Sequence, residues 1–248
     1  MFKAKTGKIK ELAEKYPERI SELEAIFDKK TNIYIDFSNI RPWATKLGWH
    51  IDIKRLEQFL HSFDTINIIN FYNGTLVGNP ESEQFNDEIK KIYTNGAKTK
   101  AVKIMKLSID TSSITANSPD LLKDFVRKPL LTKFSIETIE YLNNKLKELN
   151  QNGIMFVEDL KCNFDVEIGR DMLLDYEKNG VENFILWSGD SDFADPINQL
   201  LEDDKKVVIF GTARRIATEL NNLQQKGLFI FDIQKIRNFI CWNREQQS

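Results

Sequence analysis

The sequence predicts an α/β fold with a mainly parallel central sheet flanked by helices. From residue 31 onward, short runs rich in β-branched and aromatic residues alternate with stretches of helical periodicity. Several of these runs are almost entirely apolar, which is typical of strands that are buried on both faces of a parallel sheet. Regular alternation of strand and helix indicates crossover connections and therefore this fold class.

The first 30 residues differ from the rest in composition: they are rich in charged residues and show helical periodicity. Apolar residues recur there at three- and four-residue spacing: Ile9, Leu12, Tyr16, Ile20, Leu23 and Phe27. Pro17 divides the stretch and is expected to begin a second helix. We predict an N-terminal helical extension over residues 1–30, packed on the main domain. Its alternative use is as a contact for a protein partner or for a homo-oligomer.

The main domain is expected over residues 31–240, followed by a tail over 241–248. Strands are predicted at 32–37, 66–72, 100–107, 154–157, 183–187, 206–210 and 228–231. Helices are predicted at 53–62, where Asp52 supplies the N-cap, and at 81–93, 166–176, 193–201 and 216–225.

Residues 108–150 interrupt this alternation. They begin with a Ser/Thr-rich stretch over 108–118 and continue into a predicted helix from about 135 to 149. Because the segment lacks the Gly/Pro character of a linker, we interpret it as an insertion in the main domain and not as a second domain.

Composition excludes several classes of protein. A formal net charge of -2 argues against a globally basic nucleic-acid coat protein, although a local basic groove stays compatible with it. The two cysteines are far apart and form no CxxC pair, so a disulfide framework or a zinc site is not expected. No stretch approaches the ~18 apolar residues of a membrane helix, and no signal peptide is evident. We therefore expect a soluble, cytoplasmic protein without a membrane partner.

Acidic residues follow the predicted strands at comparable places. Asp36 closes the first strand, Asp190 and Asp192 follow the strand over 183–187, and Asp165 opens the helix after the strand near residue 156. In open α/β sheets, ligands bind beyond the carboxyl ends of the strands. All four side chains are therefore expected to meet in one crevice.

A hard cation would explain such a cluster, because Mg²⁺ and Mn²⁺ prefer oxygen ligands and share substrate phosphates with a few carboxylates. Without a metal, crowding of like charges should raise the pKa of at least one of these carboxyls. Each acid also has a structural alternative, since an Asp at the end of a strand often caps the next helix, as Asp192 would for the helix at 193.

These motifs resemble the NYN domain family of PIN-like ribonucleases, a group that includes bacterial LabA-like proteins. The string Ser188-Gly189-Asp190-Ser191-Asp192-Phe193 matches the family's most diagnostic motif closely. Asp36-Phe37-Ser38-Asn39 resembles its opening Asp-x-x-Asn, and Asp165 with Asp171 resembles its middle pair of aspartates. By order of motifs the resemblance covers roughly residues 32–236, and the insertion is unmatched.

The resemblance implies a Rossmann-like PIN fold and Mg²⁺- or Mn²⁺-dependent cleavage of RNA, with single strands favoured. It makes Asp36, Asp165, Asp190 and Asp192 the catalytic and metal-binding set, and it assigns Asn39 to positioning Asp36 or a metal-bound water. The chain departs from the family at Phe37, where a small residue is usual, and in the middle motif, where Lys161 is displaced by one position.

Asp171 matches the second middle aspartate of the family. Six residues of helix correspond to ~600° of rotation, which places Asp171 about 120° from Asp165. Its role is therefore either support of the site or attachment of the helix.

Candidate substrate contacts rest on basic residues. Lys98, Lys100, Lys103 and Lys106 form one basic strand, of which Lys100 and Lys103 are the predicted phosphate contacts. Arg127, Lys128 and Lys133 flank Pro129, and Arg214 and Arg215 follow the strand over 206–210 as further phosphate contacts. Trp43 and Trp49 are expected either to stack on bases or to pack in the core.

Two other functions compete with a ribonuclease. A PIN-like module that binds nucleic acid or a partner with little catalysis is kept open by the altered middle motif. A metal-dependent phosphatase on a related fold is disfavoured, because Asp36 is followed two residues later by Ser38 and not by an acid.

Overall fold

A computed structural model describes residues 1–110, 135–161, 163–212 and 215–242. These residues form two compact units, Met1–Ala101 with Cys162–Ser248, and Val102–Lys161. The segment expected as an insertion, 108–150, falls within the second unit.

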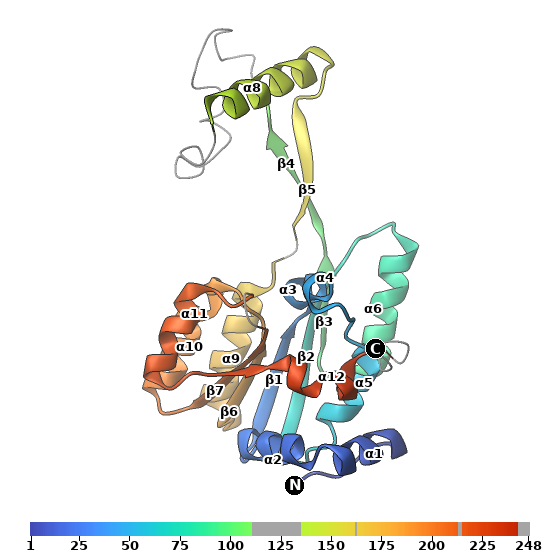
Figure 1. The fold of residues 1–248 in the computed structure, drawn as a ribbon, viewed down its shortest axis with the longest axis vertical. Helices are drawn as coiled ribbons and strands as arrows, with labels where there is room; N and C mark the ends of the chain where they lie inside the picture. Colours follow the sequence, from blue (N-terminus) through green and yellow to red (C-terminus); the bar gives the residue numbers. More distant parts are fainter. Residues whose placement is uncertain (111–134, 162, 213–214, 243–248) are drawn as a thin grey trace. The chain divides into compact units, whose positions relative to one another are not determined.

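The first unit is built on six parallel strands in the order β3-β2-β1-β6-β7-β8 (Figure 1). The strands are β1 (Thr31–Asp36), β2 (Ile66–Thr75), β3 (Ala97–Ala101), β6 (Asn183–Trp187), β7 (Lys206–Gly211) and β8 (Phe229–Asp232). The strand order reverses direction between β1 and β6. Open sheets bind ligands beyond the carboxyl ends of the strands at such a switch point.

Helices cover both faces of this sheet. One face packs on α1 (Gly7–Lys15), α2 (Pro17–Ile26), α5 (Ile53–Leu60), α6 (Pro80–Ile92) and α12 (Arg237–Ile240) through one apolar cluster. The other packs on α9 (Asp165–Asn179), α10 (Ala194–Glu202) and α11 (Thr218–Asn222) through a second cluster. β1 contributes side chains to both clusters, because Ile33 and Ile35 belong to the first cluster and Tyr34 to the second. The predicted α/β fold with a mainly parallel sheet and N-terminal helices is confirmed.

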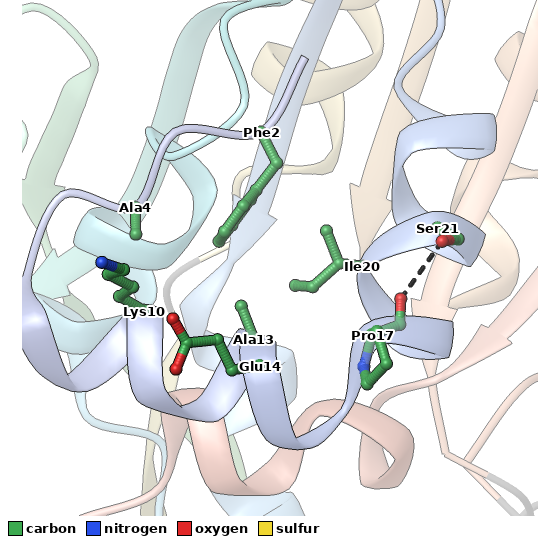
Figure 2. Close-up of a pocket in the computed structure, with 8 residues that line it drawn as sticks. All are labelled: Phe2, Ala4, Lys10, Ala13, Glu14, Pro17, Ile20 and Ser21. Atoms are coloured by element: carbon green, nitrogen blue, oxygen red, sulfur yellow. Dashed lines mark hydrogen bonds between the residues drawn. The ribbon is translucent and has the colours of Figure 1, made fainter.

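The N-terminal helices begin where the sequence indicates. Thr6 caps α1 by accepting from the Ile9 amide, and Pro17 occupies the first position of α2. Phe2 pairs with Phe63 in an antiparallel bridge, which attaches the N-terminal extension to the segment between α5 and β2. Between the two helices lies a hollow of about 510 Å³, lined by Phe2, Ala13 and Ile20 among others (Figure 2).

The second unit contains β4 (Lys103–Ser108), β5 (Phe156–Lys161) and α8 (Ile136–Gln151), of which β4 and β5 pair antiparallel. The prediction of one strand over 100–107 is therefore wrong, because Val102 separates β3 from β4 and the two strands belong to different sheets. The strand near residue 156 is also not part of the parallel sheet. Both segments have local strand character, whereas the choice of pairing partner depends on contacts that are distant in sequence.

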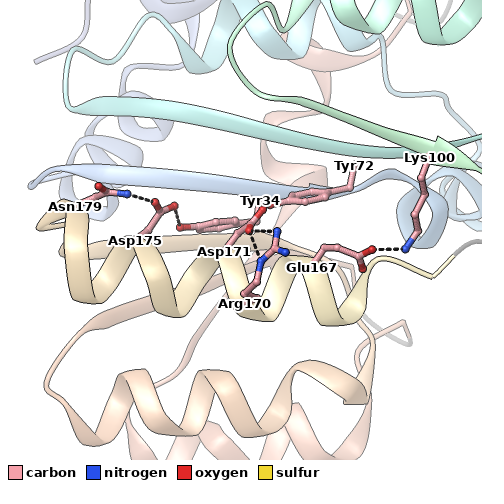
Figure 3. A network of polar contacts seen from close by, with 8 residues as sticks. All are labelled: Tyr34, Tyr72, Lys100, Glu167, Arg170, Asp171, Asp175 and Asn179. Carbon is pink, nitrogen blue, oxygen red and sulfur yellow. Dashed lines mark hydrogen bonds and ion pairs between the residues drawn. The ribbon is translucent and has the colours of Figure 1, made fainter.

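α9 is attached to the sheet through polar contacts as well as apolar ones (Figure 3). Glu167, Asp171 and Asp175 stand one helical turn apart and face three successive strands. They accept hydrogen bonds from Lys100 of β3 at 2.6 Å, from Tyr72 of β2 at 2.9 Å and from Tyr34 of β1 at 2.6 Å. Burial, together with the neighbouring carboxylate, raises the pKa of both tyrosines far above its usual value, so each hydroxyl remains a donor. This polar ladder sets the position of α9 on the sheet.

We predict that Tyr72→Phe lowers the free energy of unfolding by about 1–2 kcal/mol, because Asp171 loses a buried hydroxyl donor. The thermal midpoint, followed by circular dichroism, should fall by about 2–8 °C. Tyr141→Phe is the matched control, since the Tyr141 side chain is 61% exposed. Equal midpoints for the two variants would show that the ladder contributes nothing to stability.

Candidate metal centre

Asp36 is the innermost acid of the site and the last residue of β1, where only 5% of it is exposed. Its Oδ1 accepts from the Asn39 amide at 3.3 Å, and its Oδ2 accepts from the Ser188 hydroxyl at 3.2 Å. Burial raises the pKa of Asp36 to about 6, the hydrogen bonds from Asn39 and Ser188 oppose this rise, and Asp190 adds to it. The Asp36 carboxyl therefore exchanges its proton near neutral pH.

Asp190 follows β6, the strand next to β1, and lies on the other side of the switch point. The Ser188 hydroxyl that donates to Asp36 accepts from the Asp190 amide at 3.3 Å. Asp190 in turn accepts from the Asp192 amide at 3.2 Å and caps the short 3-10 helix Ser191–Phe193. The structural alternative in which Asp192 caps the helix at 193 is wrong, because the N-cap of α10 is Phe193 and no side chain caps that helix. Asp192 is exposed, whereas Asp190 is half-buried.

Asn39 joins the two loops at the switch point. Its backbone amide holds Asp36, while its side-chain Oδ1 accepts from the Gly189 amide at 3.1 Å. Gly189 has no room for a side chain, since a Cβ there would stand 1.8 Å from the Arg215 carbonyl oxygen. Asn39 and Gly189 therefore fix the spacing between the Asp36 loop and the Asp190 loop.

Asp165 reaches the same site from α9, of which it is the first residue. Burial raises the pKa of Asp165 to about 6, with further increases from Asp190, from a hydrogen bond with the Asp192 side chain, and from Asp36. Asn163 opposes this rise, and its Oδ1 also accepts from the Asp165 amide at 2.7 Å. The four aspartates therefore interact with one another, although Asp165 arrives from a helix and not from a strand of the parallel sheet.

The cause of the raised pKa values differs from the expectation. Only like-charge repulsion was named from the sequence as the cause, whereas burial is the largest cause for both Asp36 and Asp165 and the neighbouring acids add to it. Within the described parts of the chain, no group of three or more His, Cys, Asp or Glu side chains is arranged so that it could hold a metal ion. The metal-binding role of the four aspartates stays a prediction.

The other candidate residues lie in varied surroundings. Lys100 belongs to β3 and is bonded within the first unit, whereas exposed Lys103 belongs to β4 in the second. Arg215 is half-buried, and its Nε has no hydrogen-bond partner among the residues that the structure describes. Arg214, Arg127, Lys128 and Lys133 lie outside the described residues.

Of the two alternatives for Trp43 and Trp49, the structure shows core packing, because they are only 2% and 1% exposed and belong to the first apolar cluster. Asp171 accepts from Tyr72 and pairs with Arg170 at 2.7 Å, which is the helix-attachment role.

Sequence reasoning missed several residues that shape the site. Ser188 was quoted only as part of a motif, yet its hydroxyl links Asp36 to Asp190. Asn163 was not singled out from the sequence, yet its side-chain oxygen accepts from the amide of Asp165. Glu167, Asp171 and Asp175 did carry a signal, because acids at four-residue spacing share one helix face.

The fold and the site define an α/β protein with four interacting aspartates at the switch point of a parallel sheet. The family model described as NYN domain matches residues 115–231, a segment that includes Asp165, Asp190 and Asp192. This match confirms the resemblance to the NYN family over 115–231. It begins after the Asp36 motif, and it includes residues 115–150, which the order of motifs had left unmatched. At the level of the family, it indicates a PIN-like nuclease or RNA-binding fold.

A similar protein is "Low amplitude and bright protein LabA" of Synechococcus elongatus, which is 24% identical over 210 residues, covering 84% of this chain and 86% of the relative. A crystal structure of a protein of unknown function from Vibrio parahaemolyticus is 14% identical, with a TM-score of 0.47, and covers 86% of this chain and 96% of that one.

The raised pKa of Asp36 predicts a pH dependence of stability. The folded-state pKa of about 6 lies above the usual 3.8. The folded state therefore binds the proton more tightly, and the contribution of Asp36 to stability falls as pH rises from about 4 to 6 and is then constant. Asn has no proton to lose, so the free energy of unfolding of Asp36→Asn lacks this decrease. The difference in unfolding free energy between Asp36→Asn and wild type should therefore shift in favour of the variant by about 1–3 kcal/mol between pH 4 and pH 7.

The measurement is urea unfolding of wild type and Asp36→Asn at several pH values, with EDTA present. Asp204→Asn is the control, because Asp204 is exposed and its φ of 56° is a conformation that Asn tolerates. A difference between wild type and Asp36→Asn that is constant with pH would contradict the buried, protonated carboxyl.

Proposed function

We propose that this protein is a metal-dependent ribonuclease that hydrolyses phosphodiester bonds, with single-stranded RNA as the favoured substrate. One observation carries the proposal: carboxylates from β1, from the loop after β6 and from α9 interact electrostatically at the switch point of the sheet. The NYN match supports the same class of reaction.

By the chemistry of its oxygen ligands the set suits Mg²⁺ or Mn²⁺, although the described side chains are not arranged around one common ion position. All four side chains offer oxygen, and buried Asp36 and half-buried Asp165 each have a pKa of about 6, so a cation easily displaces their protons. Asp36 and Asp190 would hold the ion, with Asp165 and Asp192 completing its surroundings. When bound, a divalent cation neutralises charge on the phosphate and lowers the pKa of water.

The residues of the chain then have separate tasks. Asn39 and Ser188 hold the Asp36 carboxylate in one orientation through the bonds at its two oxygens. Asp165 or Asp192 orients the attacking water and accepts its proton at a carboxylate oxygen. The water oxygen forms the new bond to phosphorus while the ester P–O bond on the opposite side breaks. The departing oxygen leaves with the electron pair of that bond and takes up a proton from solvent, which balances the proton that the carboxylate accepts.

Other expectations stay proposals of the same kind. Lys103 and Arg215 are candidate phosphate contacts, and the N-terminal helices are a candidate contact for a protein partner or a second copy. Among the helices that the structure describes, none is long and apolar enough to cross a membrane. A cytoplasmic location also stays a prediction.

Asp190→Asn tests the proposal because it keeps the shape of the side chain and removes one charge. It should reduce cleavage of a labelled single-stranded RNA by about a hundredfold or more in Mn²⁺ or Mg²⁺. Its thermal midpoint should be unchanged or higher, since carboxylate repulsion is relieved. Asp204→Asn, the same change at an exposed turn, should cleave at the wild-type rate.

Cleavage that persists in EDTA, or that is equal for wild type and Asp190→Asn, would contradict this assignment. RNA binding without cleavage in either metal, across several substrates, would instead favour the binding module that the altered middle motif keeps open.

A further inference from the structure

The position of Asp165 depends on how α9 is attached to the sheet. Asp36 and Asp190 are placed by β1 and β6, whose pairing is continuous backbone hydrogen bonding. Asp165 has no such support, because it is the first residue of α9 and follows two residues, 163–164, that lie outside regular secondary structure. Side-chain contacts of these two residues and of the first turn of α9 must therefore hold Asp165 against the other acids.

Lys100 contacts three residues around Asp165. Its ammonium donates to the Asn163 carbonyl oxygen and to Glu167 Oε1, the latter at 2.6 Å (Figure 3). It also lies 4.4 Å from the centre of the Phe164 ring. Asn163, Phe164 and Glu167 all lie within two residues of Asp165, so one lysine from β3 contacts both sides of the acid along the chain.

These contacts compete with phosphate binding by Lys100. An ammonium group has three donor hydrogens, and two are directed at Asn163 and Glu167. The Lys100 and Glu167 side chains are only 36% and 33% exposed, which makes their bond stronger than an exposed surface pair. The hydrogen bond with Lys100 is also the largest cause of the lowered pKa of Glu167.

We propose that Lys100 is a positioning residue that clamps the first turn of α9 through Asn163 and Glu167 and so holds Asp165 in the acidic site, in place of the phosphate contact expected from the sequence. The catalytic part of this inference rests on the proposed ribonuclease function.

Glu167→Gln separates the two roles, because they predict opposite results. If Lys100 positions Asp165, losing the charged bond lowers kcat by about tenfold, equivalent to 1.4 kcal/mol, and leaves KM for RNA unchanged. If Lys100 binds phosphate, the same variant frees the ammonium, lowers KM and leaves kcat unchanged. The second pattern would overturn the proposal.

Lys100→Met and Lys98→Met form a matched pair. Methionine keeps an unbranched side chain beside Phe164 and removes the charge. Lys98 is exposed on the same strand, two residues away. Lys100→Met should lower kcat like Glu167→Gln and keep the salt dependence of RNA binding, whereas Lys98→Met should keep the wild-type kcat. A salt slope for Lys100→Met that is lower by about one, with kcat unchanged, would instead identify Lys100 as a phosphate contact.

Amide hydrogen exchange tests the clamp without any activity. In Glu167→Gln and Lys100→Met, exchange at residues 163–168 should rise by about tenfold, while the middle of α9 and the thermal midpoint stay near wild type. Unchanged exchange at 163–168 would overturn the clamp. If exchange at 163–168 is faster in both variants than in the wild type, but the wild type cleaves no RNA in any metal, the proposed function fails and the clamp stands.

Discussion

The burial of the Asp36 carboxyl at the switch point of the sheet is the constraint on which the rest of the site depends. A buried carboxylate lowers the folding stability unless it accepts hydrogen bonds or keeps its proton. Asp36 accepts hydrogen bonds and also holds its proton more tightly than usual. Its two oxygens accept from Asn39 and Ser188, yet its pKa still rises to about 6. The loops after β1 and β6 are arranged around this one group. The buried carboxylate therefore lowers the folding stability at the position where a bound cation would be stabilised most strongly.

Asp165 enters the site by a different physical route. The strand positions of Asp36 and Asp190 are fixed by backbone pairing, whereas α9 is fixed by side chains that contact three neighbouring strands. Two of the donors are buried tyrosines, and the third is Lys100, at the end of the ladder nearest Asp165. The packing of α9 on one face of the sheet thus determines the position of Asp165 at the edge of the sheet.

The sequence was informative where local pattern decides structure. The apolar run over 183–187 coincides with β6, and Pro17 begins α2 as expected. Proximity of Asp36 and Asp190 could also be anticipated, because strand ends meet at one edge of a parallel sheet. Asp165 reaches them from α9, after a strand that is not part of that sheet. The break at Val102 could not, since β3 and β4 have similar composition and differ only in their distant partners. For the same reason, the bonds of Lys100 and the burial of Trp43 and Trp49 required the three-dimensional structure.

The most direct test of the account is the binding of Mn²⁺ to ¹⁵N-labelled protein, followed by NMR. A paramagnetic ion broadens the amide signals nearest to it. The account predicts that small additions of Mn²⁺ broaden the amides of Asp36, Asp165, Asp190 and Asp192 before any others, and that excess Mg²⁺ reverses the effect. Broadening that is uniform, or that begins elsewhere on the chain, would contradict a shared metal centre formed by these four aspartates.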